Sequence, residues 1–487
     1  MKKSKFLSVV LFIITLSAVF SIPVDYCYAQ WLPDVRLSYT DSASVTCEGA
    51  KEIASIGNYV HAVWADGRHG YPWEIYYKRS TDQGVNWGPD TRLTTDNKQS
   101  FYPTVKVSGS TVHLIWHKWV ATPQGYYYKR SNDNGQTWSV DALLILSQGN
   151  ANFPYMAVSG NIIHVVWQDY LVGNLEIYYK RSTDGGTTWS ANERLTNNVN
   201  ESSWPCVAVS GSDVHVVWAD NRFGSSNFEI MYKRSTDYGV TWGTDTRITN
   251  APSLSAYCDI SVSGPYVHVV WEDYRTSGNF EMFYKRSTDG GATWEADNRL
   301  TYTSASNLSV VSSGALLHAT WLGYFNAVYY KRSENNGTSC GDSTRLTEGI
   351  DGIYGPSMSL AGDNVHVLWS DTRNTNNQIY YKRNPTGNTI GIHNISTEIP
   401  LSFSLSQNYP NPFNPSTSIN FAIPIPSLVR ISVFDMLGKE VEVLVNEQLS
   451  AGTYKADWNA SKYSSGAYFY KIQAGNFIET KQMLLIK

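Results

Sequence analysis

In four places along the chain, the tryptophan of an apolar run is followed two residues later by an Asp-x-Arg motif. In most copies a glutamate follows several residues later. Guanidinium groups bind carboxylates and phosphates through paired hydrogen bonds, so several of them on one surface could surround an anionic ligand. They could also form salt bridges within each loop, and the repetition of the loop favours that structural interpretation. The motifs are Asp66/Arg68, Asp220/Arg222, Asp273/Arg275 and Asp371/Arg373. The glutamates are Glu74, Glu176, Glu229 and Glu281, of which Glu176 belongs to a repeat that has Asp169 without the arginine.

A second recurring feature is an aromatic residue just before a short apolar run. Aromatic faces in such a place could stack on sugar rings, or they could form the wall of a central channel. The sequence leaves both interpretations open. The residues are Tyr102, Phe153, Trp204, Tyr257 and, one place earlier in its copy, Tyr354.

Seven histidines recur at intervals of 48 to 53 residues, which indicates a repeat architecture. Because each histidine belongs to a different repeat, they cannot gather as metal ligands, and we predict structural roles. We find no zinc motif, calcium loop, phosphate loop or Gly-x-Ser-x-Gly elbow, so we predict no metal and no cofactor. The histidines are His61, His113, His164, His215, His268, His318 and His366.

Each repeat is predicted to form four strands. In the fourth copy these are Val207–Val209, Val214–Trp218, Glu229–Arg234 and Trp242–Thr249, separated by turn residues. Four strands per unit of this length are typical of a β-propeller blade. The sequence therefore predicts an all-β, seven-bladed propeller.

The turn between the third and fourth strands has the form Ser-Thr-Asp-x-Gly-x-Thr-Trp. Ser and Asp can bond nearby backbone N–H groups, Gly supplies a positive φ, and Trp covers the turn, so folding alone explains the motif. It resembles the Asp-box, or BNR repeat, of sialidases and related propellers. This resemblance implies the fold and not the activity, because such boxes occur in many propellers that are not sialidases. The copies are Ser80–Trp87, Ser131–Trp138, Ser182–Trp189, Ser235–Trp242 and Ser287–Trp294, with a degraded sixth copy at Ser333–Cys340.

The sialidase resemblance also implies candidate catalytic residues. The first repeat, from Val63–Arg68 through Arg79–Gly84, is similar to the family. Family members use a loop carboxylate as acid/base, for which Asp66 and Glu74 are candidates, and a tyrosine nucleophile, for which Tyr354 is in about the right place. The family's arginine triad could be supplied by Arg222, Arg275 and Arg373.

The chain departs from the sialidase pattern in several ways. Residues 51–60 contain no arginine where the family has its Arg-Ile-Pro motif, seven blades are expected instead of six, and no glutamate stands out to activate the tyrosine. We therefore rank binding of extracellular glycans or surface polymers first. An exo-alpha-sialidase or other glycoside hydrolase comes second, and a protein–protein interaction scaffold comes third.

The ends of the chain predict how the ring closes and where the protein goes. The seventh repeat lacks a fourth strand, and Trp31–Ser38 has the Trp-to-Arg spacing of one, so it should complete the last blade. Residues 1–29 have the charged start, apolar stretch and small-residue end of a secretory signal. We predict a signal peptide over 1–29, a propeller over 30–384, a linker over 385–401 and a small Ig-like β-sandwich over 402–487.

The tail resembles the type A C-terminal sorting domain of type IX secretion substrates. The matching segments are Tyr409–Pro412, Val433–Lys439, Gly466–Phe469 and Lys481–Lys487. The resemblance implies a Gram-negative bacterium, interaction with the type IX machinery, and release or surface attachment. The alternative is an Ig-like accessory domain.

Composition limits the possible partners and cross-links. Across 487 residues the net charge is −4 and no basic run stands out, so nucleic acid is not expected as a partner. Nothing after the signal is apolar enough for a transmembrane span, and we expect a monomer. Cys206 and Cys258 lie near the start of the first strand in adjacent repeats, where a disulfide is possible, although the sequence does not establish pairing.

Overall fold

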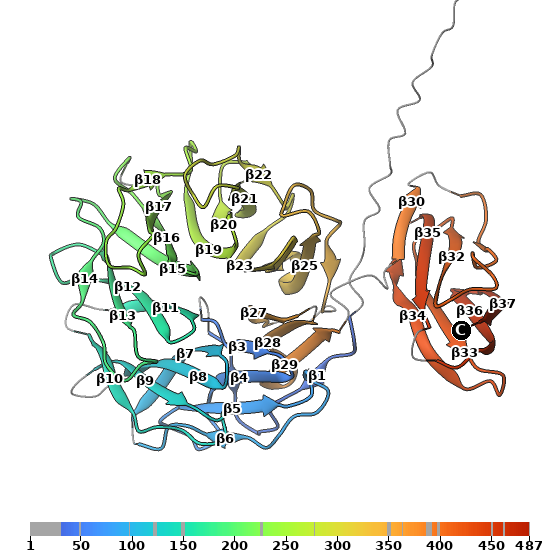
Figure 1. The fold of residues 1–487 in the computed structure, drawn as a ribbon, viewed down its shortest axis with the longest axis horizontal. Helices are drawn as coiled ribbons and strands as arrows, with labels where there is room; N and C mark the ends of the chain where they lie inside the picture. Colours follow the sequence, from blue (N-terminus) through green and yellow to red (C-terminus); the bar gives the residue numbers. More distant parts are fainter. Residues whose placement is uncertain are drawn as a thin grey trace, which may run out of the picture.

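The computed structural model describes residues 31–487 apart from 48–49, 97, 120–123, 148–150, 225–226, 277, 348–351, 363, 386–391, 397–399, 450, 461–462 and 487. The predicted signal peptide lies outside the described residues. Seven antiparallel sheets form a closed ring, and the first strands of neighbouring sheets contact each other around the axis (Figure 1). The predicted seven-bladed propeller is confirmed.

The first four blades follow the chain order of the repeats. Blade one contains β2 (Ser44–Val45), β3 (Ile53–Ile56), β4 (Tyr59–Asp66), β5 (Glu74–Ser80) and β6 (Thr91–Arg92). Blade two contains β7 (Gln99–Ser108), β8 (Thr111–Trp119), β9 (Gly125–Ser131) and β10 (Ala142–Leu146). Blade three contains β11 (Asn152–Ser159), β12 (Ile162–Asp169), β13 (Glu176–Ser182) and β14 (Glu193–Arg194). Blade four contains β15 (Ser202–Ser210), β16 (Asp213–Asp220), β17 (Glu229–Ser235) and β18 (Thr246–Arg247).

The last three blades complete the ring. Blade five contains β19 (Ser255–Ser263), β20 (Tyr266–Asp273), β21 (Glu281–Ser287) and β22 (Asn298–Arg299). Blade six contains β23 (Ala305–Ser313), β24 (Leu316–Gly323), a short 3-10 helix η1 (Tyr324–Asn326), β25 (Ala327–Ser333) and β26 (Thr344–Arg345). Blade seven contains β27 (Tyr354–Ala361), β28 (Asn364–Asn374), β29 (Asn376–Asn384) and β1 (Val35–Arg36).

The N-terminal strand closes the ring as predicted. Val35 of β1 pairs with Tyr381 of β29, and Leu32 donates its backbone N–H to Arg383 at 3.0 Å. Trp31 packs edge-on against Tyr330 of blade six with ring centroids 4.9 Å apart, as the Asp-box tryptophans do in the other blades. The N-terminal segment thus replaces the missing fourth strand and its covering tryptophan.

A histidine–tyrosine–glycine contact joins successive blades and explains the repeated histidines. His164 Nδ1 lies 2.8 Å from the hydroxyl of Tyr179 in the same blade. That hydroxyl packs against Gly239 in the Asp-box of the next blade, where φ is 75° and an added Cβ would lie 2.0 Å from the oxygen. Burial lowers the pKa of His164 to about 4, so the imidazole is neutral at neutral pH.

The Lys-Arg pair that ends each third strand also links blades. Lys180 Nζ donates to the Leu144 carbonyl of the preceding blade at 3.1 Å, and Arg181 Nη1 donates to the Tyr238 carbonyl of the following blade at 2.8 Å. Equivalent bonds recur around the ring, for example from Lys285 to Ile248 and from Arg79 to Asn134. The repeated sequence is therefore accounted for by contacts that hold each blade to both neighbours.

The C-terminal unit is a small β-sandwich of two four-stranded sheets. Trp458 and Phe413 pack in its core with centroids 5.5 Å apart. Its first strand, β30, lies within residues 385–401, which were expected from the sequence to be a linker. β30 instead pairs with β35 and belongs to the sandwich. The strands are β30 (Ile392–Ser396), β31 (Ser404–Leu405), β32 (Ser416–Ile423), β33 (Ser427–Phe434), β34 (Glu440–Leu449), β35 (Gly452–Asn459), β36 (Gly466–Ala474) and β37 (Phe477–Leu485).

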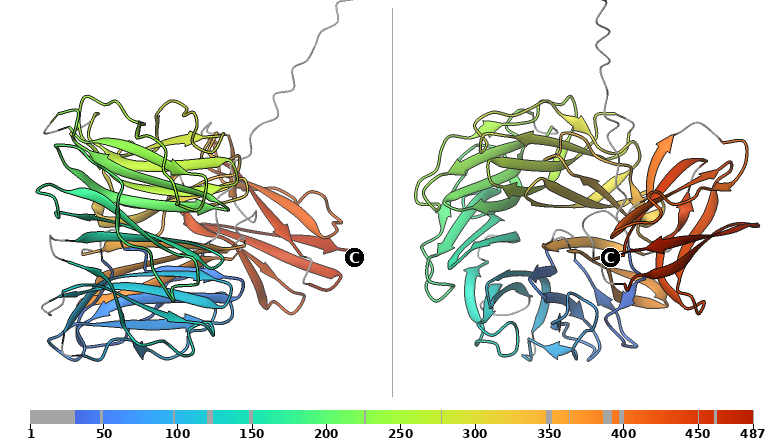
Figure 2. Two further views of the ribbon diagram at one scale, coloured as in Figure 1. Left: turned by 60° about the vertical axis from the view of Figure 1, so that its left-hand side comes forward. Right: turned by 45° about the vertical axis from the view of Figure 1, so that its right-hand side comes forward.

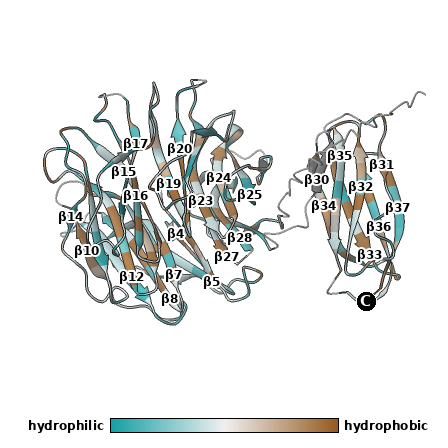
Figure 3. Cartoon of the chain, turned by 45° about the horizontal axis from the view of Figure 1, so that its top comes forward, coloured by the Kyte–Doolittle hydropathy of each residue, from teal (hydrophilic) through white to brown (hydrophobic). Residues whose placement is uncertain are grey.

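Figure 2 shows the two units from further directions, and Figure 3 shows apolar residues concentrated in their strands and hydrophilic residues in the connecting loops. This is the distribution expected when side chains are buried between adjacent sheets.

Candidate functional site

The propeller has two distinct faces. On the first, which we call the box face, the Asp-box turn of blades one to six bonds the turn between the first and second strands of the same blade, as in Tyr238 N–H to the Ser212 carbonyl at 2.8 Å. On the second, the loop face, the loop between the second and third strands meets the chain entering the first strand, as in Ser255 N–H to the Phe228 carbonyl at 2.8 Å. All the predicted site residues lie toward the loop face.

Four of the predicted aromatic residues lie inside β-bulges of the first strands and have left-handed backbone conformations. A positive φ is unusual for a bulky non-glycine residue, and bulges re-aim the side chains that they carry. Tyr102, Phe153 and Tyr257 are 42%, 40% and 42% exposed, whereas Trp204 is half-buried. We call these four residues the inner arc; their φ angles are 54° for Tyr102, 52° for Phe153, 52° for Trp204 and 49° for Tyr257.

The inner arc is held by neighbouring aromatic and polar groups. Trp204 lies 4.5 Å from Tyr257 and 5.3 Å from Phe228, measured between ring centroids. Its backbone N–H donates to Gln168 Oε1 of the preceding blade at 2.7 Å, which fixes the bulge. Tyr257 also meets Phe280 edge-on at 6.4 Å. The rings are therefore positioned before any ligand arrives, which lowers the entropy cost of binding.

The inner arc has one residue in each of blades two to five. The other three blades have no aromatic residue at the corresponding bulge position. Asn307 occupies the bulge position in blade six and Gly355 in blade seven. Tyr354 is one residue before that position and is 44% exposed. In blade one, an insertion separates β2 from β3, and its described residues are 46–47 and 50–52. The loop face is thus aromatic on one side of the axis and more varied on the other.

The insertion in blade one reaches across the ring. Lys51 Nζ donates to Asp259 Oδ2 of blade five at 2.6 Å and to Ser309 Oγ of blade six at 2.9 Å. The Tyr155 hydroxyl of blade three donates to the other oxygen of Asp259. Lys51 and Asp259 are both buried. Burial and the charge of Lys51 lower the pKa of the nearby Lys106 to about 8.

We call Lys51, Tyr155, Asp259 and Ser309 the axial cluster. This cluster was not predicted from the sequence, although a variable position in the repeats indicates it. The residue after the bulge varies from blade to blade, with serine alone occurring twice, while most of the surrounding sequence repeats. These residues are Glu52, Thr104, Tyr155, Cys206, Asp259, Ser309 and Ser357.

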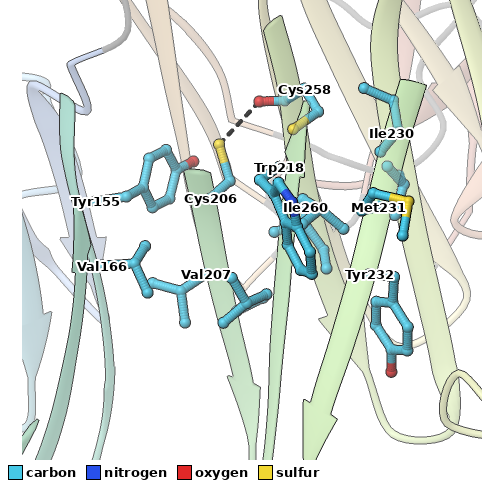
Figure 4. Packing of buried hydrophobic residues seen from close by; sticks show 14 of the residues in the cluster. Tyr155, Val166, Cys206, Val207, Trp218, Ile230, Met231, Tyr232, Cys258 and Ile260 are labelled. Carbon is cyan, nitrogen blue, oxygen red and sulfur yellow. Dashed lines mark hydrogen bonds between the residues drawn. The ribbon is translucent and has the colours of Figure 1, made fainter. Parts of the chain in front are cut away.

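Cys206 and Cys258 lie together in the adjacent first strands β15 and β19. Both thiols are free and buried, and Cys206 Sγ donates to the Cys258 carbonyl at 2.8 Å (Figure 4). Burial and the neighbouring Cys258 thiol raise the pKa of Cys206 well above its usual value. Cys206 therefore packs as a protonated thiol next to Cys258, with Trp218 and Tyr155 in the same buried cluster.

The Asp-x-Arg motifs form charge clusters within each blade. The Arg68 guanidinium bonds Asp66 at 2.7 Å and Asp90 at 2.6 Å, and Lys78 bonds Asp90 at 2.9 Å. Two acids and two bases cancel each other's charge. The same arrangement surrounds Arg222, Arg275 and Arg373, and Lys118 takes the place of the arginine in blade two.

The sequence interpretation missed the second acid of each cluster. It stands two residues before the arginine of the fourth strand in most blades, a spacing that is visible in the sequence. Asp34 supplies it to Arg373 in blade seven, so the N-terminal strand also completes this cluster. The acids are Asp34, Asp90, Asp141, Asp245 and Asp297.

The two candidate acid/base carboxylates are buried and bonded. Asp66 accepts hydrogen bonds from Ser44, Trp64 and Arg68, and although burial opposes ionisation, these donors hold its pKa below the usual value. Glu74 pairs with Asp66 across β4 and β5 and accepts from Arg92 at 2.6 Å. Burial raises the pKa of Glu74. These contacts are those of a structural cluster.

The third candidate, Tyr354, belongs to the adjoining blade. Its backbone carbonyl accepts a hydrogen bond from Thr46 Oγ1 at 3.0 Å, beside the Ser44–Asp66 contact. The three candidates therefore lie on one face of blades one and seven. Among the described residues, no group of three His, Cys, Asp or Glu side chains could hold a metal ion.

Glu52 is a buried carboxyl whose hydrogen-bonding capacity is only partly satisfied. Oε1 accepts from the Cys47 N–H at 2.7 Å, and Oε2 has no hydrogen-bond partner among the described groups. Burial raises the pKa of Glu52 well above its usual value, and the Cys47 bond opposes this only in part. Glu52 is therefore protonated in the folded state at a pH where it ionises in the unfolded chain.

This difference predicts a pH-dependent effect of Glu52→Gln. The wild type loses stability as pH rises from the unfolded pKa to the raised folded pKa, because the unfolded state binds fewer protons. Glutamine lacks this dependence. The stability of the variant relative to wild type should grow with pH, by up to about 1.4 kcal/mol per pH unit in that window. Thermal melts from pH 4 to 9 measure it, and parallel curves would refute the assignment.

The fold and the tail together define an exported β-propeller. Residues 407–487 match the model of the secretion system C-terminal sorting domain. The chain is therefore sorted for secretion or surface attachment in a Gram-negative bacterium, as the tail predicted. No helix among the described residues is long and apolar enough to cross a membrane.

Three similar proteins were found by comparison with known sequences and structures. The chain is 27% identical over 164 residues to the xyloglucanase Xgh74A of Acetivibrio thermocellus, a match covering 29% of this chain and 18% of that protein. A polysaccharide lyase of family PL25, an ulvan lyase, superposes with a TM-score of 0.51 at 10% identity, covering 71% of this chain and 95% of the other. Trypanosoma rangeli sialidase gives a TM-score of 0.41 at 11% identity, with 93% and 90% covered.

The lyase superposition supports the propeller fold. The chain spans less than a fifth of the length of the xyloglucanase that it matches.

Proposed function

We propose that this protein binds extracellular glycans through the inner arc on the loop face of its propeller. The observation that carries the proposal is the set of four aromatic residues held at positive φ in successive blades. Strained backbone conformations persist when the surrounding structure fixes them, and they gather at ligand sites. Folding does not require a large aromatic there, because Asn307 and Gly355 occupy the same position in other blades.

The carbohydrate assignment has two supports. Tyrosine and tryptophan rings offer flat apolar faces with few rotatable bonds, which suits the C–H faces of sugar rings. The xyloglucanase similarity and the export signal fit an extracellular carbohydrate ligand.

A glycan array tests the proposal. The mature propeller, with its sorting domain, should bind a subset of immobilised glycans, and Trp204→Ala should lose that binding. Absence of binding to every glycan, by a protein whose melting curve is cooperative, would refute the proposal.

A panel of fluorogenic glycosides, including a sialoside, separates a binder from a hydrolase. For a binder, Tyr354→Phe and Asp66→Asn should leave glycan affinity nearly unchanged. If the wild type released sugar, and Tyr354→Phe lowered the rate by orders of magnitude, the hydrolase interpretation would replace ours.

A further inference from the structure

Exposed aromatic side chains are distributed unequally between the two faces of the propeller. Of fourteen in its described residues, thirteen lie toward the loop face, and Tyr238 alone lies on the box face. The thirteen are Tyr39, Tyr71, Tyr102, Trp119, Phe153, Tyr170, Phe223, Tyr257, Tyr274, Tyr302, Tyr324, Phe325 and Tyr354.

Six of these residues form a second set outside the inner arc, at or after the end of the second strand in blades one to six. We call this set the outer ring. Its members are between 43% and 71% exposed, so burial does not explain them, and concentrated exposed apolar surface marks an interaction site. They are Tyr71, Trp119, Tyr170, Phe223, Tyr274 and Phe325.

Charge on the same face is neutralised within the blades. The guanidinium of Arg222 is bonded to Asp220 at 2.7 Å and to Asp245 at 2.9 Å, and Lys233 bonds Asp245 at 2.9 Å. To bind an anionic ligand, the arginine would have to leave two carboxylates. A face of aromatic rings and compensated charges suits a ligand that is rich in hydroxyls and carries no charge.

We propose that the loop face binds an uncharged, extended polysaccharide, with the inner arc as the central contact and the outer ring lengthening it over neighbouring blades. This inference rests on the proposed glycan binding and names its ligand class. A polymer that reaches several aromatic platforms gains affinity over a short oligosaccharide, because later contacts form within one complex.

Affinity electrophoresis and calorimetry test the ligand class with three uncharged polymers, xyloglucan, galactomannan and mixed-linkage β-glucan, and with ulvan as the anionic polymer. At least one uncharged polymer should bind more tightly than ulvan. Raising NaCl from about 0.05 M to about 0.5 M should change that affinity less than about twofold, because no ligand charge is screened. Tighter binding of ulvan that salt weakens would overturn the inference and leave glycan binding standing.

The outer ring is tested with two ligands: the uncharged polymer that binds most tightly, and a heptasaccharide made from the same polymer. Phe223→Ala/Tyr274→Ala should weaken polymer binding at least about tenfold and heptasaccharide binding less than about twofold. Trp204→Ala, in the same pair of blades, should weaken both. Tyr238→Ala, on the box face, should affect neither. The extended contact would be refuted if the outer-ring variant weakened polymer and heptasaccharide binding equally, or weakened neither. Failure of every glycan to bind would instead refute the proposed function itself.

Discussion

Replacing Lys51 with methionine should lower the free energy of unfolding of the propeller by about 3–5 kcal/mol, because it leaves the buried carboxylate of Asp259 without its counter-charge. Asp259 would keep the hydrogen bonds from the Tyr155 hydroxyl and the Val310 N–H, but it would lose the ammonium group that offsets the cost of its burial. Chemical denaturation followed by tryptophan fluorescence measures the loss.

The double variant Lys51→Met/Asp259→Asn is the matched control. It removes both charges and keeps similar volumes, so it should regain most of the stability that Lys51→Met loses. A double variant that is no more stable than the single variant would contradict the ion-pair account. It would indicate that Lys51 contributes through the packing of its own side chain.

Replacing Tyr257 with alanine should weaken glycan binding by about 1–3 kcal/mol, roughly a 5- to 150-fold increase in Kd, because one stacking platform is lost. Tyr238→Ala is the matched control, since Tyr238 has a φ of 62° and is 45% exposed but lies on the opposite face. Both substitutions place alanine at a positive φ, so their effects on stability should be similar. Titration calorimetry gives the affinities, and equal affinities for the two variants would count against the inner arc.

The sequence was sufficient to predict the propeller and its closure. The contacts between blades recur because the same positions of adjacent repeats make them, as Tyr179 and Gly239 do. A fixed sequence period is therefore sufficient to predict them. Closure of the last blade followed from the spacing in Trp31–Ser38. The Asp-x-Arg pairs lie within one loop, so their structural interpretation was also accessible.

The details of the site were less accessible. The aromatic residues were found, but their left-handed conformation was not, although Pro103, Pro154 and Pro205 directly follow three of them and proline within a strand favours a bulge. The axial cluster could not be predicted, because Lys51 and Asp259 are 208 residues apart and meet only when the ring closes.

The most direct test of the central claim is equilibrium binding of the tightest glycan from the array to wild type and to Trp204→Ala/Tyr257→Ala, with Tyr238→Ala alongside. The account predicts that the double substitution in the inner arc raises Kd more than about 100-fold while Tyr238→Ala leaves it unchanged. Wild-type affinity in the double variant, with its fold intact, would show that the glycan binds elsewhere and would contradict the account.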